Sequence, residues 1–430
     1  MPENRWDLLA RRYDTGEIVR VAMAGTRIES VQSPGVPLSG STSASTLSQA
    51  VDNAEESSLP WVSPGFVDIQ INGYGGQEFS SLDLTPQRVA DIVRQHFAFG
   101  VTRVCPTLTT QSLAVLSHGV TTIRAACEKY PDVNQAVAGV HLEGPYFSTE
   151  DGPRGAHPAE HCRRPSWPEF VALQEASGGR VRLLTMSPEF DEAPAFIARV
   201  VSSGVTVAIG HTGASGRQIR AAVDAGARLS THLGNGAHRM LRRHPNYLWD
   251  QLAEDRLWAS LIVDGHHLPP EVVKTFLRAK TTARCLLVSD VSGLAGLSPG
   301  RYTSSGCELE ILADGRLVIA GQDQLLAGAS APIGVGIANV MRFAGLDVTE
   351  AVGMATHAPA TLLSIAASRL EAGSAADLVL FDLPADLNNV RDCAETGQAA
   401  PDPARAEAPN TNEGLTIRTT ILAGQIVYQK

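Results

Sequence analysis

The chain has 430 residues, of which 43% are hydrophobic and 19% charged, so it can bury a large core and is too long for one small domain. The formal net charge is −10, the sequence pI is about 5.7, and there is no basic run. This balance argues against nucleic acid or an anionic membrane as partner. No segment reaches the roughly 18 apolar residues of a membrane span, and the first residues lack the continuous apolar stretch of a signal peptide. We therefore expect a cytoplasmic protein.

The cysteines are scattered and form no CxxC pair. A chain of this size does not need disulfides to be stable. We expect free thiols in a reducing compartment at all six positions, Cys105, Cys127, Cys162, Cys285, Cys307 and Cys393.

The first 60 residues contain a short alternating segment and then a polar stretch. Alternation in GEIVRVAMAGTRIESV (16–31) predicts β structure, whereas QSPGVPLSGSTSASTLSQAVDNAEESS (32–58) is rich in Ser, Pro and Gly and has too few apolar residues to pack. We assign residues 1–60 to the first part of a small β domain.

From residue 61 to about 364 the pattern changes to short apolar runs such as AVAGVHLEG and VTVAIGH, separated by segments able to form helices, such as RVADIVRQHFAFG. Repeated βα units over about 300 residues predict a parallel barrel or a doubly wound sheet. No GxGxxG follows the first strand, which disfavours a dinucleotide fold. Polar residues at the ends of many strands favour a (β/α)₈ TIM barrel: Gln70, Glu143, Glu189, His211, His232, Asp264 and Asp290.

Two further strands are predicted after the barrel, in SAADLVLFDL (374–383) and LTIRTTILAGQIVYQK (415–430). A loop rich in Pro, Ala, Asn and acidic residues separates them, and we expect it to be flexible over about 384–413. Strands from both ends of the chain can pair with each other. Residues 365–430 are therefore the second part of the small β domain.

Three motifs place a metal-capable side chain directly after an apolar strand: HLEGPYF (141–147), AIGHTG (208–213) and STHLGNG (230–236). Glu143, His211 and His232 would then converge at one end of the barrel. One carboxylate and two imidazoles with an open coordination position suit a catalytic Zn²⁺, with Fe²⁺ as an alternative. Any one of them alone is more simply an ordinary polar residue at a strand end, but the three together favour the metal.

A base for such a metal site is offered by LLVSDVSGLAG (286–296), in which an apolar run leads to Asp290. This carboxylate could take a proton from metal-activated water and pass it to a leaving amine. The structural alternative is that Asp290 caps the N-terminus of a helix, because aspartate is a common cap.

The motifs PGFVDIQINGYGG, GVHLEGPYF, GAHP, GHTGAS, THLGNG, DGHHL, LVSD, LAGAS and ATHAPATLLSI with GSAADLVLFD resemble, in this order, those of the N-acetylglucosamine-6-phosphate deacetylase family in the amidohydrolase superfamily. The resemblance covers about residues 60–385, and the ordered set is specific although no single motif is. It implies a (β/α)₈ barrel with a small β-sandwich built from both chain ends, and a homodimer.

Carried over by position, the resemblance makes Glu143, His211 and His232 the ligands of the catalytic metal and Asp290 the acid/base. It places His157 near the scissile carbonyl, where an imidazole can polarise the oxygen or stabilise the oxyanion. It implies a guanidinium contact to phosphate from Arg243 and a sugar or phosphate contact from His267 of the neighbouring subunit. The other residues implied to contact substrate are Ala156, Asn235, Gly236 and, in the acetyl pocket, Leu326.

Many amidohydrolases carry HxH on the first strand and bind two metals, whereas this chain has Gln70-x-Asn72. Amides are weak ligands for Zn²⁺, and none of the four lysines lies in a strand-end motif where a carboxylated lysine could bridge two metals. We expect one divalent ion per subunit, with Gln70 at most at a vacant or weak second position.

The segment after His232 departs from the family. GNGAHRMLRRHPN (234–246) lacks a large side chain at Gly234 and adds His238, Arg239 and Arg242. Either the sugar end of the pocket is altered or these are solvated loop residues. We favour structural or supporting roles for the remaining ambiguous residues, His141, Glu189, His244 and His266.

The expected reaction is deacetylation of N-acetylglucosamine 6-phosphate to glucosamine 6-phosphate and acetate. One alternative keeps the chemistry and changes the substrate to N-acetylgalactosamine 6-phosphate, an unphosphorylated sugar or an N-acyl amino acid. The other is a sugar-phosphate-binding protein without catalysis, against which the complete Glu/His/His/Asp set argues.

Overall fold

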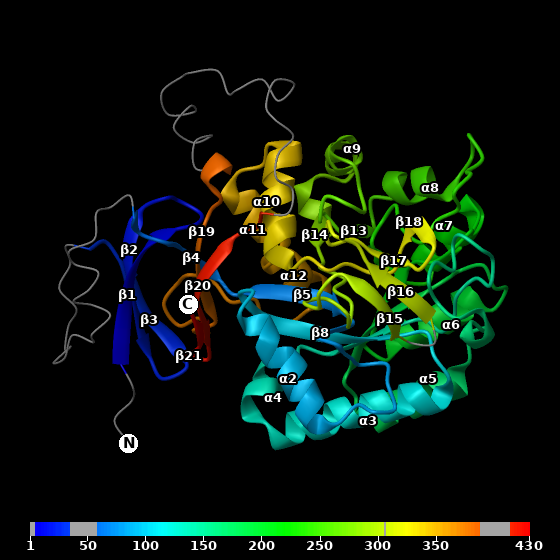
Figure 1. Cartoon of the computed structure of the whole chain (residues 1–430), viewed down its shortest axis with the longest axis horizontal. Helices are drawn as coiled ribbons and strands as arrows, with labels where there is room; N and C mark the ends of the chain where they lie inside the picture. Colours follow the sequence, from blue (N-terminus) through cyan, green and yellow to red (C-terminus); the bar gives the residue numbers. More distant parts are fainter. Residues whose placement is uncertain (1–4, 35–57, 305–306, 388–412) are drawn as a thin grey trace.

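The computed structural model describes residues 5–34, 58–304, 307–387 and 413–430. Cys393, nearly all of the polar stretch 32–58 and most of the loop predicted at 384–413 lie outside these residues. Figure 1 shows two parts side by side, a small sheet at one end and a barrel with its helices at the other. Among the described helices, none combines the length and apolar character needed to cross a bilayer.

Both ends of the chain contribute to the small sheet, as predicted. Its strand order is β21-β20-β19-β4-β1-β2-β3, and β1 pairs with β4 in parallel while the other neighbours are antiparallel. Alternate apolar residues such as Val21, Met23 and Ile421 are fully buried on one face. The strands are β1 (Arg5–Arg12), β2 (Ile18–Ala24), β3 (Arg27–Gln32), β4 (Trp61–Pro64), β19 (Leu378–Asp382), β20 (Thr416–Leu422) and β21 (Gln425–Gln429).

The described strands of the small domain are joined into one seven-stranded sheet. One detail of this domain differs from expectation. Strand β4 belongs to this sheet, because it pairs with β1 and β19, so the barrel begins at Phe66 and not at residue 61. The short apolar run at Trp61–Pro64 resembles a barrel strand in sequence, and only its pairing separates it from one.

The barrel has eight parallel strands, which confirms the predicted fold class. It closes where Ile71 of the first strand bridges Val291, just after the last strand. The strands are β5 (Phe66–Ile71), β8 (Val101–Thr109), β9 (Val140–Glu143), β10 (Val181–Met186), β11 (Thr206–Ile209), β12 (Leu229–Ser230), β13 (Trp258–Leu261) and β14 (Cys285–Leu287).

Helices with one apolar face surround these strands (Figure 1). In α7, Ser215 and Gln218 form a capping box at the N-terminus, and Ile219, Ala222 and Val223 are buried at helical spacing. The helices are α2 (Pro86–Phe97), α3 (Leu113–Lys129), α4 (Pro131–Ala136), α5 (Trp167–Ala176), α6 (Ala193–Ser202), α7 (Gly216–Asp224), α8 (Tyr247–Ala253), α9 (Pro270–Lys280), α10 (Ile333–Ala344), α11 (Val348–Met354) and α12 (His357–Leu362), with 3₁₀ turns η2 (Ala159–His161) and η3 (Thr282–Arg284).

An antiparallel meander between β14 and α10 was not predicted. Its apolar residues pack into a separate small cluster that includes Leu309, Ile311 and Leu317. The dipeptide Asp314-Gly315 between two alternating runs is a hairpin signal that could have revealed it. The strands are β15 (Gly300–Ser304), β16 (Cys307–Ile311), β17 (Leu317–Ile319) and β18 (Gln322–Leu326); a shorter hairpin, β6 (Gly73–Tyr74) and β7 (Gln77–Glu78), follows β5.

Candidate active site

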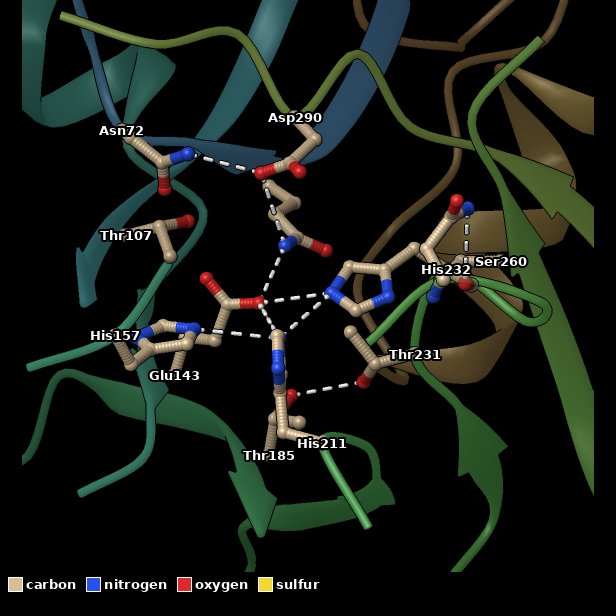
Figure 2. A network of polar contacts seen from close by, with 12 residues as sticks. Asn72, Thr107, Glu143, His157, Thr185, His211, Thr231, His232, Ser260 and Asp290 are labelled. Atoms are coloured by element: carbon tan, nitrogen blue, oxygen red, sulfur yellow. Dashed lines mark hydrogen bonds and ion pairs between the residues drawn. The ribbon is translucent and has the colours of Figure 1, made fainter. Parts of the chain in front are cut away.

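Three of the predicted site residues have an unusual backbone conformation. His211, His232 and Asp290 follow strands β11, β12 and β14 and have φ values of 51°, 31° and 52°. Only six non-glycine residues in the described chain have positive φ, so half of them lie in this site. Such conformations are costly for residues with a Cβ and persist where the surroundings enforce them. Here they let three strand ends present their side chains to one point (Figure 2).

The side chains of Glu143, His211 and His232 meet in a compact triangle. Glu143 Oε1 lies 3.3 Å from His211 Nε2 and 3.0 Å from His232 Nε2, and the two imidazole nitrogens are 3.1 Å apart (Figure 2). Ligands at 2.0–2.1 Å from a tetrahedral Zn²⁺ would be about 3.3–3.4 Å from one another. The three atoms therefore fit a single divalent metal with little movement.

His157 lies next to this triangle. Its Nε2 is 3.2 Å from His211 Nε2, and Glu143, His157 and His211 also bring ligand atoms within 4.8 Å of one another. We favour Glu143, His211 and His232 as the metal-binding set. Their three candidate ligand atoms are all within 3.3 Å of one another, so each atom contacts the other two. In that arrangement His157 is not a ligand and lines the cavity beside the triangle.

Neighbouring groups orient the ligands. His211 Nδ1 lies 2.9 Å from the carbonyl oxygen of Pro153, which requires the proton on Nδ1 and leaves the Nε2 lone pair for a metal. The backbone N–H of His232 donates to Ser260 Oγ at 2.7 Å, which holds the turn after β12. His232 Nδ1 is buried and has no hydrogen-bond partner among the described residues.

The electrostatics of the triangle favour a cation. Burial opposes ionisation of Glu143, but its contacts with the imidazoles of His211 and His232 outweigh burial and hold the pKa of this carboxyl well below its usual range. Burial lowers the pKa of His211, and burial with the nearby His211 lowers the pKa of His157 to about 3. Burial also works against a proton on His232, yet the Glu143 carboxylate raises its pKa. A bound divalent ion would take the place of that proton.

Asp290 is buried beside the triangle. Its Oδ1 accepts hydrogen bonds from Gln70 Nε2 at 3.1 Å and from Asn72 Nδ2 at 2.8 Å. Burial and the charge of Glu143 raise the pKa of Asp290 to about 6, which suits a group that accepts a proton near neutral pH. No helix begins at residue 290, so the alternative of a helix cap is not supported.

These groups open onto a cavity of about 390 Å³, which is in the range of small-molecule sites. The three metal-binding candidates, Asp290 and His157 line it, together with five of the six predicted substrate residues: Ala156, Asn235, Gly236, His267 and Leu326. The sixth, Arg243, is exposed and lies outside these walls. Gln70 is buried beneath Glu143 Oε1, to which it donates at 2.9 Å.

His267 lines the cavity of its own chain, whereas the family resemblance implied that a neighbouring subunit supplies it. Its Nδ1 lies 2.8 Å from Asp264 Oδ2, and the backbone N–H groups of His266 and His267 both donate to Asp264 Oδ1 at 2.9 Å. Burial opposes ionisation of Asp264, but its hydrogen bond with His267 lowers the pKa to about 2. Asp264 therefore orients His267 so that Nε2 is free for a ligand.

The added residues after His232 are not all solvated. His238 Nε2 lies 3.0 Å from Glu150 Oε1, and Tyr247 OH lies 3.0 Å from His238 Nδ1. Arg239 donates to Gln322 Oε1 at 3.2 Å, which joins this loop to strand β18. Both His238 and Arg239 line the cavity, but Arg242 does not. The basic residues of this segment could be noticed in the sequence. Their contacts with Glu150, Tyr247 and Gln322 depend on the tertiary structure.

The remaining ambiguous residues have supporting or structural positions. His141 is fully buried inside the barrel, with Nδ1 3.3 Å from Thr107 Oγ1 and Nε2 2.7 Å from Thr185 Oγ1. Glu189 accepts a hydrogen bond from Ser187 Oγ. His266 lines the cavity, and His244 is exposed.

Comparison with known proteins gives a consistent result. The family model described as the amidohydrolase family matches residues 61–427. The chain is 33% identical to N-acetylglucosamine-6-phosphate deacetylase of Bos taurus over 379 residues, which cover 86% of this chain and 83% of the relative. It is 31% identical to N-acetylgalactosamine-6-phosphate deacetylase of Shewanella sp. (strain ANA-3), with coverage of 70% and 73%.

Among solved structures, the chain is similar to a mutant of N-acetyl-D-glucosamine-6-phosphate deacetylase from Mycobacterium smegmatis in complex with N-acetyl-D-glucosamine-6-phosphate. The TM-score is 0.80 at 28% identity, and the match covers 99% of this chain and 100% of that chain. The enamidase structure, at 13% identity and a TM-score of 0.54, shares the fold alone.

Proposed function

This chain belongs to the amidohydrolase family and, within it, to the N-acetylglucosamine-6-phosphate deacetylases, and we propose that it hydrolyses N-acetylglucosamine 6-phosphate to glucosamine 6-phosphate and acetate. The observation that carries the proposal is the triangle of Glu143, His211 and His232 atoms beside Asp290, open to one cavity. A protein that only bound a sugar phosphate would need neither a metal nor an acid/base next to it.

Glu143, His211 and His232 would hold one divalent metal, which we propose to be Zn²⁺, with Fe²⁺ as the alternative. When bound, such an ion supplies an activated water and polarises the acetyl carbonyl. Gln70 and Asn72 offer amide groups where many amidohydrolases have histidines, and both donate N–H to carboxylates in this structure. Their nitrogens carry no lone pair for a metal, which supports one ion per chain.

Asp290 accepts the proton of the attacking water and returns it to the departing sugar amine. Its carboxylate is buried and its pKa is raised to about 6, so it is ionised at neutral pH and still basic enough to accept a proton. His157 is neutral because of its low pKa, and its Nε2 carries the proton that points to His211 Nε2. If His211 Nε2 held the metal, this N–H would be available to the acetyl oxygen of the substrate.

The phosphate end of the substrate would meet basic side chains on the cavity wall. Arg239, His266 and His267 line the cavity, and Asp264 leaves His267 Nε2 free. We propose Arg239 as the guanidinium of this chain that binds phosphate, because it lines the cavity and Arg243 does not. A guanidinium fork matches phosphate oxygens.

A second candidate substrate is N-acetylgalactosamine 6-phosphate, which is favoured by the similarity to deacetylases of that name and by the altered loop after His232. The missing side chain at Gly234 does not widen the pocket, because a Cβ there would lie 3.0 Å from Leu268 and 3.1 Å from Phe276. Acetate release measured on the two phosphorylated sugars, on plain N-acetylglucosamine and on an N-acyl amino acid decides between them. Turnover of none of these by metal-loaded protein would contradict the proposed function.

We further propose a homodimer in the cytoplasm. Met240 and Trp249 are 89% and 52% exposed, which is unusual for large apolar side chains and is consistent with a second copy covering this region. The five described cysteines are free thiols, as expected in a reducing compartment. Light scattering of the purified protein tests the dimer.

A further inference from the structure

Two amide side chains bind the same oxygen of Asp290. Asn72 Nδ2 and Gln70 Nε2 both donate to Oδ1, at 2.8 Å and 3.1 Å, and the bond from Asn72 is drawn in Figure 2. Gln70 Nε2 uses its second hydrogen for Glu143 Oε1 at 2.9 Å. The opposite orientation of either amide would set its oxygen against a carboxylate oxygen, so the network itself decides the orientation.

The backbone around these amides is tied together on both sides. The N–H of Asp290 donates to the Gln70 carbonyl at 3.0 Å, and the N–H of Asn72 donates to the Val291 carbonyl at 2.8 Å. Gln70 and Asn72 are two residues apart at the end of β5, so their side chains share one face. Oδ1 of the fully buried Asp68 accepts from the N–H of Gln70 and of Ser289, at 3.3 Å each. The amides and Asp290 are thus held in one rigid frame.

This frame also joins two buried carboxyl groups, those of Glu143 and Asp290. Gln70 places one N–H on each, and Asn72 adds a second N–H to Asp290. Two N–H donors on one oxygen oppose rotation of the Asp290 carboxylate, so the amides fix which of its two oxygens stays engaged.

We propose that Gln70 and Asn72 are positioning residues that hold Asp290 through Oδ1 and leave Oδ2 as the oxygen that accepts and returns the proton. Both amide donors lie on Oδ1, and no hydrogen bond to Oδ2 is present among the described residues. The inference rests on the proposed function, and it replaces the sequence-based interpretation of Gln70 as a weak metal position. The amides occupy the end of β5 as donors, not as ligands.

The test compares Asn72→Asp with Asn72→Ala in zinc-loaded protein. Asn72→Asp keeps the shape but exchanges the donor for a charged acceptor, while Asn72→Ala removes the donor and adds no charge. Positioning predicts that kcat falls in the order wild type, Ala variant, Asp variant, with about a 10²-fold loss for Asn72→Asp, KM within about threefold and zinc content unchanged. A purely structural role predicts the reverse order of the variants, because only the Ala variant leaves a void.

A binding measurement adds a readout that does not depend on turnover. By calorimetry, Asn72→Asp should weaken a phosphonate analogue of the tetrahedral intermediate at least tenfold and leave the affinity for glucosamine 6-phosphate unchanged. Asn134→Asp is the matched control, because it makes the same exchange at an exposed residue of α4 and should behave as wild type. Gln70→Glu provides a second variant at the clamp, should Asn72→Asp fail to fold.

The inference is overturned if Asn72→Asp and Gln70→Glu keep wild-type kcat, if Asn72→Ala is the more damaged of the two Asn72 variants, or if zinc is lost together with the amides. In each case wild type would still deacetylate the sugar phosphate. Failure of the proposed function would instead be seen as inactive wild type, so the two failures are distinct.

Discussion

The two ends of the cavity are built in different ways. At the metal end, the buried side chains of Glu143, His211 and His232 lie within 3.3 Å of one another. Both histidines and the neighbouring Asp290 have a costly backbone conformation with positive φ. At the opposite end, the loop after His232 contacts Glu150 and Gln322 through half-buried or exposed side chains. The proposed catalytic residues thus lie on the barrel strands, whereas the proposed recognition residues lie on a loop, where substitutions are usually tolerated better than in the core.

The largest effect is expected from emptying the metal end. His211→Ala or His232→Ala should remove the metal and reduce deacetylation to background, because each would supply one of the three proposed ligand atoms. Metal analysis of wild type should give about one tightly bound divalent ion per chain. Two tightly bound ions in anomalous scattering would refute the single-metal site.

The next effect is that of Asp290→Asn, which keeps the shape but cannot accept a proton. We expect kcat to fall by about 10²–10⁴-fold, toward the upper end because the residue is proposed to serve both proton transfers. Metal content should be retained and substrate Kd should change by less than about tenfold. Loss of metal would instead identify Asp290 as a ligand, and loss of thermal stability with kcat retained would identify a structural role.

At the recognition end, formed by the loop after His232, Arg239 and Arg243 should differ in their effect on substrate binding. Arg239→Ala should cost on the order of 1.5–3 kcal/mol of binding to the phosphorylated substrate, the range for a hydrogen bond to a charged group, with little effect on the plain sugar. Arg243→Ala should have a smaller effect, because Arg243 lies outside the cavity of its own chain. If Arg243→Ala proves the more harmful, the original assignment from the family resemblance is right.

A smaller effect is expected from pH, because kcat should depend on the ionisation state of Asp290. Burial and the charge of Glu143 raise its pKa to about 6, and the group must be ionised to accept a proton. Activity should therefore be about half of its maximum near pH 6, approach the maximum about one pH unit higher, and fall as the pH drops through the pKa. A cation bound nearby would move this acid limb to lower pH. A kcat profile with its acid limb above pH 7 would exclude Asp290 as the base.

The smallest effect is expected for Glu150→Gln. Glu150 pairs with His238 at 3.0 Å, but its side chain is 62% exposed, and exposed ion pairs contribute about 0.2–1 kcal/mol. Steady-state kinetics should show KM raised by no more than about fivefold and kcat unchanged. A large loss of kcat would mean that the recognition loop also shapes the metal end.

Residues at the metal end could be predicted because their signals are local. Glu143, His211, His232 and Asp290 each follow an apolar run, and parallel strands bring their carboxyl ends to one edge whatever the details of packing. The pairing of the two chain ends followed from alternation in the same way. The Asp314-Gly315 dipeptide between β16 and β17 is likewise a local signal, and it indicates part of the meander.

The tertiary structure alone decided which neighbours each residue has. Arg239 and Arg243 are four residues apart in one basic run, yet only Arg239 lines the cavity. The same holds for β4, a barrel-like run that pairs with the small sheet, and for Gln70 and Asn72, whose amides bind Asp290 more than 200 residues away. Local patterns determine which strands form and where their ends lie, because periodicity is a short-range property of the sequence. Contacts between distant segments depend instead on how the loops pack and on which sheet edge each strand pairs with.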